Sequence, residues 1–431
     1  MSSKKKTILL IATLLLVIIL AGFAYWFIAP TSNSVTQTID PIGRITGFQP
    51  LNRPSTGNMP TQTPSTGEPT SQATSTQQQP VVVIPSLRLL SDTPVGGYGA
   101  STTARTTFVR WVDRGRGNVI EAHSDTLDTS VLSNTVVPRT YTSLWNRDLS
   151  AFIASVLEET TEVATTLYAG LIRTKTVGTS TPESLGTTPY ELKGQKLPPN
   201  IISYATSPRK DKVFMLIEEN GRGVGYVSTF QGSAITRIFD TPLTQLVAEW
   251  PEENTITLTT KASSQQSGFL YFVNPKTGIW KKVLGPTVGL TTRTSHDAKQ
   301  VFASFTDQAG MISSALYTVS TEKTLDPGIK TLAEKCVWGN FYKHIVYCGV
   351  PTSFPDASYP DDWYKGTVST SDKIWDVNAT TGEVRLVTSL SDKADRIINS
   401  FNLQLDERDD FLFFMNKNDL SLWSLDLVSS N

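Results

Sequence analysis

The segment 351–370, which reads PTSFPDASYPDDWYKGTVST, concentrates side chains that could recognise a ligand. Aromatic rings provide stacking area and carboxylates accept hydrogen bonds from hydroxyl groups, so the combination suits a protein or glycan partner. With its three prolines, the segment predicts a compact binding lobe on one face of the molecule. Its candidate binding residues are Phe354, Tyr359, Asp361, Asp362, Trp363 and Tyr364. The alternative, which we favour, is that these rings form a satellite core that plugs one end of the repeat unit.

Cys336 and Cys348 are the only cysteines of the chain, and they flank a stretch that opens with VWGNFYK. If residues 336–338 and 345–348 are adjacent antiparallel strands, the two thiols face each other across a hairpin centred near Tyr342. A disulfide closing so short a loop would contribute about 3 kcal/mol, and conditions outside the cytoplasm permit one. We predict this disulfide, with two buried free thiols as the alternative. No Cys-x-x-Cys spacing indicates catalysis or metal binding.

Other residues that often carry chemistry are scattered. The three histidines, His123, His296 and His344, are isolated in the sequence, so no metal site or Ser-His-Asp triad is indicated. The chain has no Gly-x-Ser-x-Gly elbow of the kind that hydrolases use. The glycine-rich residues 221–225 are expected in a hairpin turn without a following helix, which disfavours phosphate binding.

A cluster of carboxylates near the C-terminus lacks the spacing of a calcium loop. It comprises Asp406, Glu407, Asp409 and Asp410. We interpret it as a solvated turn, and we expect neither a bound metal nor a cofactor.

These residues belong to a repeated unit that returns about every 44 residues. Apolar strand anchors stand at Val213, Ile256, Val301 and Ile345. An aromatic residue follows each anchor in a second apolar run, at Tyr226, Tyr271, Tyr317 and Trp375. Because a unit of this size leaves an apolar face exposed, it must stack on copies of itself. The period therefore predicts an all-β protein, a β-propeller of four-stranded blades.

Three further anchors, Ile120, Phe152 and Phe411, bring the total to seven at less regular spacing. We therefore favour seven blades, with six or eight as alternatives. Residues 175–199, rich in Thr, Gly and Pro, are expected to form a long loop. The sequence LRLL at 87–90 could supply the outer strand of the last blade and so close the ring.

The N-terminal part has a different composition. A lysine triplet at 4–6 precedes an uncharged apolar run long enough to cross a bilayer as a helix. The run exceeds a typical signal-peptide core and lacks a good cleavage site, so we expect a retained anchor. The predicted organisation is a cytoplasmic N-terminus (1–6), a transmembrane signal-anchor helix (7–29), a disordered Ser/Thr/Pro/Gln-rich linker (30–80) and the propeller (81–431).

The repeat resembles the TolB-type, WD-like propeller repeat of bacterial envelopes. The likeness rests on SPRKDKVF at 207–214, LYFVNPKTG at 270–278 and IWDVNATTG at 374–382, and it covers roughly residues 105–427. The Asp-Gly that usually precedes the repeat's lysine is absent from every unit. The resemblance implies an envelope protein whose relatives are mostly binding or scaffolding modules, or non-catalytic domains of peptidases.

The charge balance excludes a nucleic-acid partner, since 38 basic and 39 acidic residues leave a formal net charge of −1. We expect a single-pass protein of the cytoplasmic membrane with its propeller outside the cytoplasm. Its expected role is non-enzymatic, to bind or scaffold a protein or glycan partner in the cell envelope. The rival hypothesis is a carbohydrate-active hydrolase or lyase using channel carboxylates, one of them with a raised pKa. A third possibility is a mechanical spacer subunit.

Overall fold

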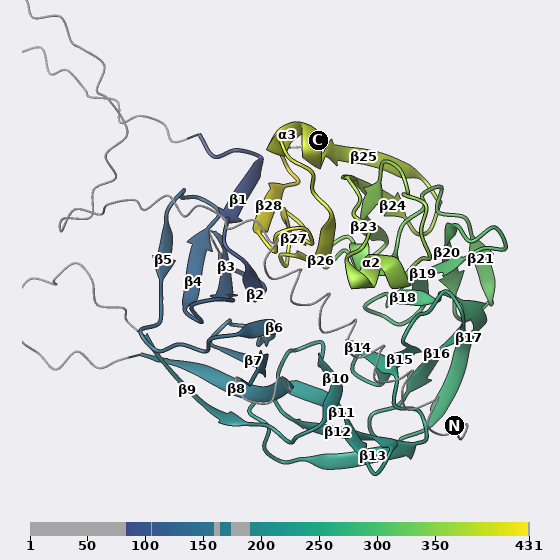
Figure 1. The fold of residues 1–431 in the computed structure, drawn as a ribbon, viewed down its shortest axis with the longest axis horizontal. Helices are drawn as coiled ribbons and strands as arrows, with labels where there is room; N and C mark the ends of the chain where they lie inside the picture. The colour runs from purple at the N-terminus through teal and green to yellow at the C-terminus, as the bar shows by residue number, and fades with distance from the viewer. Residues whose placement is uncertain (1–82, 105, 159–163, 174–189, 430–431) are drawn as a thin grey trace, which may run out of the picture. The chain divides into compact units, whose positions relative to one another are not determined.

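A computed structural model of the protein describes residues 83–104, 106–158, 164–173 and 190–429. They form seven antiparallel sheets of four strands arranged as a ring, which confirms the all-β propeller with seven blades (Figure 1). The predicted helix 7–29 and linker 30–80 lie outside the described residues. Among the residues that the structure describes, no helix has the length and apolar character needed to span a bilayer.

The first four blades follow the order of the chain. Blade 1 consists of β2 (Val95–Thr102), β3 (Thr107–Asp113), β4 (Val119–His123) and β5 (Thr129–Val131). Blade 2 consists of β6 (Thr140–Trp145), β7 (Ala151–Leu157), β8 (Ala164–Arg173) and β9 (Tyr190–Lys196). Blade 3 consists of β10 (Ile201–Thr206), β11 (Lys212–Glu219), β12 (Arg222–Thr229) and β13 (Thr236–Thr241). Blade 4 consists of β14 (Leu246–Glu252), β15 (Thr255–Thr260), β16 (Ser267–Val273) and β17 (Trp280–Val288).

The last three blades carry the helices. Blade 5 consists of β18 (Thr291–Thr294), β19 (Gln300–Thr306), β20 (Ile312–Thr318) and β21 (Lys323–Leu325). The short helix η1 (Ala333–Lys335) leads into blade 6, which consists of β22 (Cys336–Trp338), β23 (Ile345–Pro351), β24 (Asp372–Asn378) and β25 (Val384–Ser389). Helix α2 (Asp361–Lys365) lies between β23 and β24, and α3 (Leu390–Ala394) follows β25. Blade 7 consists of β26 (Ser400–Leu405), β27 (Phe411–Asn416), β28 (Leu422–Asp426) and β1 (Leu87–Ser91).

The ring is closed by the N-terminal strand. β1 pairs antiparallel with β28, with Leu87 opposite Leu425 and Leu89 opposite Trp423. This is the pairing predicted for residues 87–90, and it removes the open edge that a blade of three strands would expose. The last blade is therefore built from both ends of the described chain.

Two expectations about the blades were wrong. Ile120 lies in β4, the third strand of its blade, whereas the other anchors lie in second strands. In blade 1 the second strand is β3, where Phe108 stands 44 residues before Phe152. Both strands are apolar, so hydrophobicity alone did not distinguish them. Part of the predicted loop 175–199 is also a strand, β9, which pairs with β8 from Arg173–Tyr190 to Leu167–Lys196.

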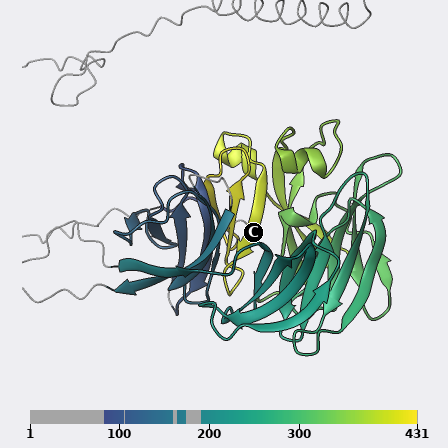
Figure 2. The ribbon, with the colours of Figure 1, turned by 60° about the horizontal axis from the view of Figure 1, so that its bottom comes forward.

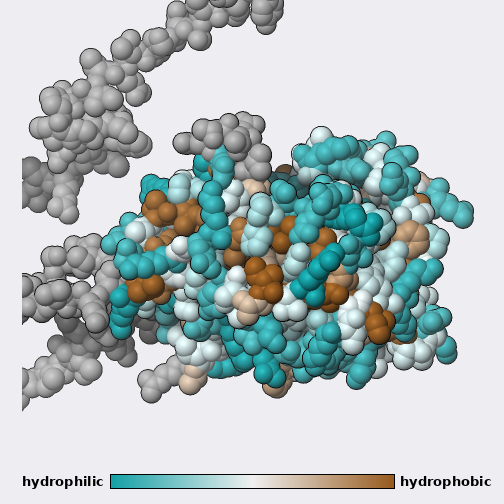
Figure 3. All heavy atoms as spheres, turned by 90° about the horizontal axis from the view of Figure 1, so that it is seen from below, coloured by the Kyte–Doolittle hydropathy of each residue, from teal (hydrophilic) through white to brown (hydrophobic). Residues whose placement is uncertain are grey.

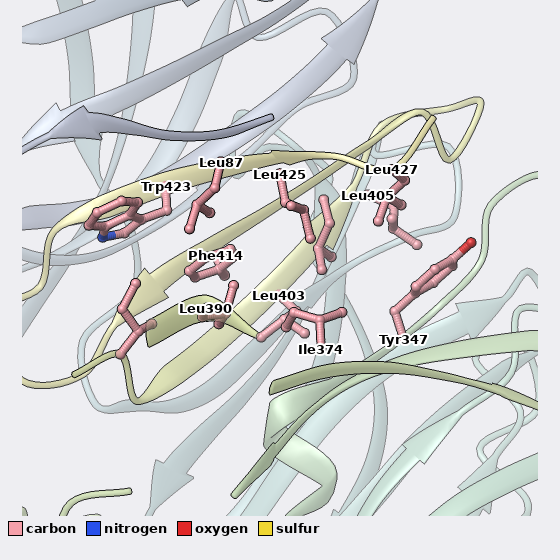
Figure 4. Packing of buried hydrophobic residues seen from close by; sticks show 12 residues of the cluster. Leu87, Tyr347, Ile374, Leu390, Leu403, Leu405, Phe414, Trp423, Leu425 and Leu427 are labelled. Atoms are coloured by element: carbon pink, nitrogen blue, oxygen red, sulfur yellow. The ribbon is translucent and has the colours of Figure 1, made fainter. Parts of the chain in front are cut away.

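The core is distributed between neighbouring blades. One cluster joins β1, blade 6 and blade 7 through Leu87, Ile374, Phe414 and Trp423 (Figure 4). Each fully buried Leu or Phe side chain contributes about 1.5–3 kcal/mol. On the rim seen in Figure 3, apolar side chains lie in small separate groups among polar ones. The apolar side chains of the described residues therefore pack mainly between neighbouring blades.

Two faces follow from the alternating strand directions. Turns between the first and second strands, and between the third and fourth, lie on one face, which we call the hairpin face. Turns between the second and third strands, and the connections between blades, lie on the opposite face, which we call the insertion face. Figure 2 shows both helices, α2 and α3, at the upper edge of the ring, on this insertion face. Around the central channel, contacts between first strands of neighbouring blades join β2 to β6, β10 to β14, β18 to β22, β22 to β26 and β26 to β2 (Figure 1).

Candidate functional site

The insertion 351–370 turns its largest rings toward the protein. α2 begins after Pro360 and ends at Gly366, whose positive φ of 76° closes the helix. Tyr359 and Trp363 are 2% and 3% exposed and pack against Ile312 and Leu332 of blade 5 and its connection. The Trp363 indole nitrogen donates to the Asn399 side chain at 3.1 Å. These two rings therefore lie in a satellite core.

The other four predicted binding residues do not form one surface with them. Phe354 is partly buried and contacts the Tyr359 ring edge-on at 5.4 Å. Asp361 accepts a hydrogen bond from the backbone of Ser264 in blade 4, and Asp362 accepts one from Ser358 at 2.9 Å. Tyr364 is 40% exposed, and its hydroxyl donates to Glu334.

A buried ion pair lies next to the insertion. Lys335 and Asp372 are each 1% exposed, and the ammonium lies 2.8 and 2.9 Å from the two carboxylate oxygens. Thr370 accepts a third hydrogen bond from Lys335 at 2.7 Å, and Ser400 donates to Asp372. Burial lowers the pKa of Lys335, which Asp372 opposes. Because each N–H group of the ammonium has a partner, the pair is not available to a ligand. The hydrogen bond from Ser400 connects the pair to blade 7.

The channel contains a small charged cluster. Glu249 of β14 pairs with Arg293 of β18 at 2.5 Å, and Glu334 of η1 lies beside them with Tyr364. Burial acts to lower the pKa of Arg293, but the two glutamates outweigh it and raise the pKa. The hollow that these side chains line has a volume of about 70 Å³. Among the described carboxyl groups, the one whose pKa is raised is that of Asp410, which lies on the hairpin face and not in this cluster.

The disulfide hairpin between β22 and β23 presents two other rings to solvent. Cys336 and Cys348 are bonded and stand directly opposite each other in the two strands. At the tip, Phe341 is 66% exposed and Tyr342 is 48% exposed, with their rings edge-to-face at 4.9 Å. These are larger exposed fractions than those of the aromatic rings in the insertion.

The hairpin tip is held from below by Asp409 of blade 7. Its carboxylate accepts hydrogen bonds from three successive backbone N–H groups, those of Asn340, Phe341 and Tyr342, at 2.8–3.1 Å. The Asn340 amide donates to the carbonyls of Leu405 and Asp406. The backbone of the tip is therefore fixed while its rings point away from the core, an arrangement that lowers the entropic cost of binding.

The carboxylate cluster at 406–410 forms the expected turn, but only Glu407 and Asp410 are open to solvent. Asp406 and Asp409 are 0% and 4% exposed. Asp406 accepts from Thr102 and Thr107 of blade 1 and from the backbone of Asp410. Asp406 and Asp409 are buried because their carboxylates accept hydrogen bonds from hydroxyl and backbone donors of neighbouring blades. The local sequence does not reveal these partners.

A groove of about 520 Å³ opens beside the hairpin, between blades 6 and 7. It is lined by Tyr342, His344, Tyr347, Asp376, Glu383, Arg385, Asp409, Asp410 and Val428, among others. In Figure 4 the Tyr347 ring lies at the end of the core cluster with its hydroxyl directed away from the other labelled side chains. Burial and the carboxylates of Asp409 and Asp376 raise the pKa of Tyr347 to about 12, so it remains a neutral hydroxyl.

The remaining sequence candidates stay dispersed. His123 pairs with Glu121, His296 contacts the carbonyl of Trp338, and His344 is exposed at the groove. Among the described residues, no group of three or more potential ligands could hold a metal ion. Gly221 lies in the β11–β12 turn. Sequence reasoning identified the cysteine hairpin but gave its tip no role; the signal available was two adjacent aromatics between paired cysteines.

No protein-family model and no curated protein matches this chain. Similar solved structures include TolB from Acinetobacter baumannii (12% identity, 74% of this chain and 63% of that chain, TM-score 0.39). A puromycin-hydrolysing peptidase from Mycobacterium tuberculosis is 11% identical, with 76% of this chain and 52% of that chain covered and a TM-score of 0.45. Oligogalacturonate lyase from Vibrio parahaemolyticus is 10% identical, with 77% of this chain and 97% of that chain covered and a TM-score of 0.44. The chain spans less than two thirds of the first two. The likeness concerns the propeller fold, which these enzymes share with TolB.

Proposed function

We propose that the protein is a non-catalytic binding module whose partner docks on the hairpin face, between blades 6 and 7. The observation that carries this proposal is the pair of exposed rings, Phe341 and Tyr342, on a fixed backbone beside the 520 Å³ groove. Aromatic anchors next to a pocket dominate the energetics of many interfaces. Three hydrogen bonds to Asp409 and the disulfide hold these anchors before any partner arrives.

The module belongs, in this proposal, to the outer side of the cytoplasmic membrane, with residues 7–29 as its anchor and a protein or glycan of the cell envelope as its partner. The lysines at 4–6 before the apolar run support this orientation. The Cys336–Cys348 disulfide supports an oxidising compartment, since such bonds are rare in the cytosol.

The rival function, a carbohydrate-active hydrolase or lyase, draws support from Glu249 and Glu334 at the channel. Their hollow of about 70 Å³ is far below the roughly 300–1,000 Å³ of typical ligand pockets. Arg293 pairs with Glu249 and lies close to Glu334, which compensates their charge. These features favour an internal ion-pair network at the channel over a catalytic pair of carboxylates.

The test compares substitutions on the two faces in the full chain, purified in mild detergent. Phe341→Ala combined with Tyr342→Ala should reduce capture of the partner from envelope extracts at least tenfold, because both anchors are lost. Tyr364→Ala, on the insertion face at similar exposure, should leave capture unchanged. Loss of capture by Tyr364→Ala alone would place the partner on the insertion and overturn the proposal.

A further inference from the structure

The charges around the groove are unequal. Four carboxylates, those of Asp376, Glu383, Asp409 and Asp410, line it with a single guanidinium, that of Arg385. Counting four negative charges against one positive charge leaves a net charge of −3. A groove with this excess attracts cations and repels anions, and the field acts before contact is made.

The carboxylates differ in what they already bind. Asp376 is paired with Arg385, and Asp409 is occupied by the hairpin amides. The carboxylates of Glu383 and Asp410, in contrast, accept no hydrogen bond from any residue in the described part of the chain. The acceptors that remain for a ligand are therefore two carboxylates, which favour a charged donor.

The aromatic side of the groove favours the same chemistry. Tyr342 lines the groove, and Phe341 stands beside it with its ring edge against the Tyr342 ring. A lysine or arginine head over such a ring gains about 0.5–1 kcal/mol at an exposed site. Its aliphatic stem can cover the ring while the head reaches a carboxylate.

We infer that the groove between blades 6 and 7 takes lysine or arginine side chains of an extended segment of a partner protein. This inference rests on the proposed function and names the partner class for the same site. The segment lays its apolar stems on Phe341 and Tyr342, and its cationic heads meet Glu383 and Asp410. The volume of about 520 Å³ lies within the range of ligand pockets.

The experiment measures binding of fluorescent octalysine, octaglutamate and uncharged dextran to the full chain in mild detergent at low salt. Octalysine should bind, and Glu383→Gln combined with Asp410→Asn should weaken it about tenfold, since each exposed pair contributes up to about 1 kcal/mol. The control, Asp356→Asn combined with Asp392→Asn, removes the same charge from exposed residues of the insertion face and should change binding less than twofold. Thermal unfolding of each variant verifies that it is folded.

Three outcomes would overturn the inference. In the first, octalysine fails to bind. In the second, the groove variant and the control variant weaken octalysine binding equally, which means that the peptide responds only to the general surface charge. In the third, dextran or octaglutamate binds instead, and its binding requires Phe341 and Tyr342. The hairpin face is then the binding site, but for a different class of ligand. If Phe341→Ala with Tyr342→Ala leaves every probe and the captured partner unaffected, the proposed function itself fails.

Discussion

The insertion 351–370 and the hairpin between β22 and β23 are both aromatic loops of blade 6, yet they direct their rings in opposite ways. Beneath the insertion lie Ile312 and Leu332, so Tyr359 and Trp363 turn inward and are covered. Beneath the hairpin lies the carboxylate of Asp409, which binds the backbone amides of the tip, while the rings of Phe341 and Tyr342 stay exposed. The surface underneath an aromatic loop therefore decides whether its rings become core or stay exposed.

The largest effect is expected at the ion pair beside the insertion. Asp372→Ala leaves the ammonium of Lys335 buried without its counter-charge, and it should lower the free energy of unfolding by about 3–5 kcal/mol. Urea unfolding monitored by fluorescence measures this loss. Asp362→Ala, within the insertion and in a more exposed pair with Lys365, should cost less than about 1 kcal/mol. Equal costs would mean that the insertion is not anchored through Lys335.

Trp363→Ala tests the insertion rings directly. Removing the buried indole should destabilise the protein by about 3 kcal/mol or more, while capture of the partner at the hairpin face is preserved in the folded fraction. Chemical unfolding and capture are measured on the same preparation. A stable variant that no longer captures the partner would show that the insertion is the binding site after all.

Asp409→Asn tests whether this carboxylate fixes the backbone of the hairpin tip. Asparagine tolerates the left-handed backbone at this position, where φ is 61°, but it offers one acceptor oxygen to three N–H groups. We expect a loss of about 2 kcal/mol in unfolding free energy and faster amide exchange at residues 340–342, measured by hydrogen exchange. Unchanged exchange would contradict the view that Asp409 fixes the tip.

The smallest effect concerns the pH dependence contributed by Asp410. Burial raises the pKa of Asp410 above 3.8, and the nearby carboxylates of Asp406, Asp426 and Asp409 add to this effect. The guanidinium of Arg408 opposes it. The folded state therefore holds this proton more tightly than the unfolded state does. The resulting stabilisation is present below pH 3.8 and is lost as the pH rises through the folded pKa.

Asp410→Asn should consequently stabilise the protein at pH 7 by less than about 0.5 kcal/mol, because the group is largely solvated. The gain should disappear near pH 3, where the wild-type carboxyl is protonated in both states. Urea titrations at the two pH values provide the comparison. A gain that persists at pH 3 would have a cause other than charge.

The fold could be predicted from the sequence because each second strand carries its own apolar anchor, such as Val213, Ile256 and Val301. The prediction failed where this signal was ambiguous: β4 is as apolar as β3, and the outer strand β9 is too polar to be noticed.

The site was less accessible from sequence. The contact that fixes the hairpin joins Asp409 to residues 67–69 positions earlier in another blade. Likewise, Lys335 meets Asp372 only through the packing of the insertion and its neighbours. Composition identified both aromatic loops, but which way their rings point depends on such partners, and a single sequence does not show them.

Photo-crosslinking in the cells that make the protein shows whether the partner meets the hairpin face. A crosslinking amino acid replaces either Tyr342 or Tyr364, two tyrosines of similar exposure on opposite faces of blade 6. We predict a discrete crosslinked partner from position 342 and none from position 364. The same partner crosslinked from position 364 and absent from position 342 would contradict the account.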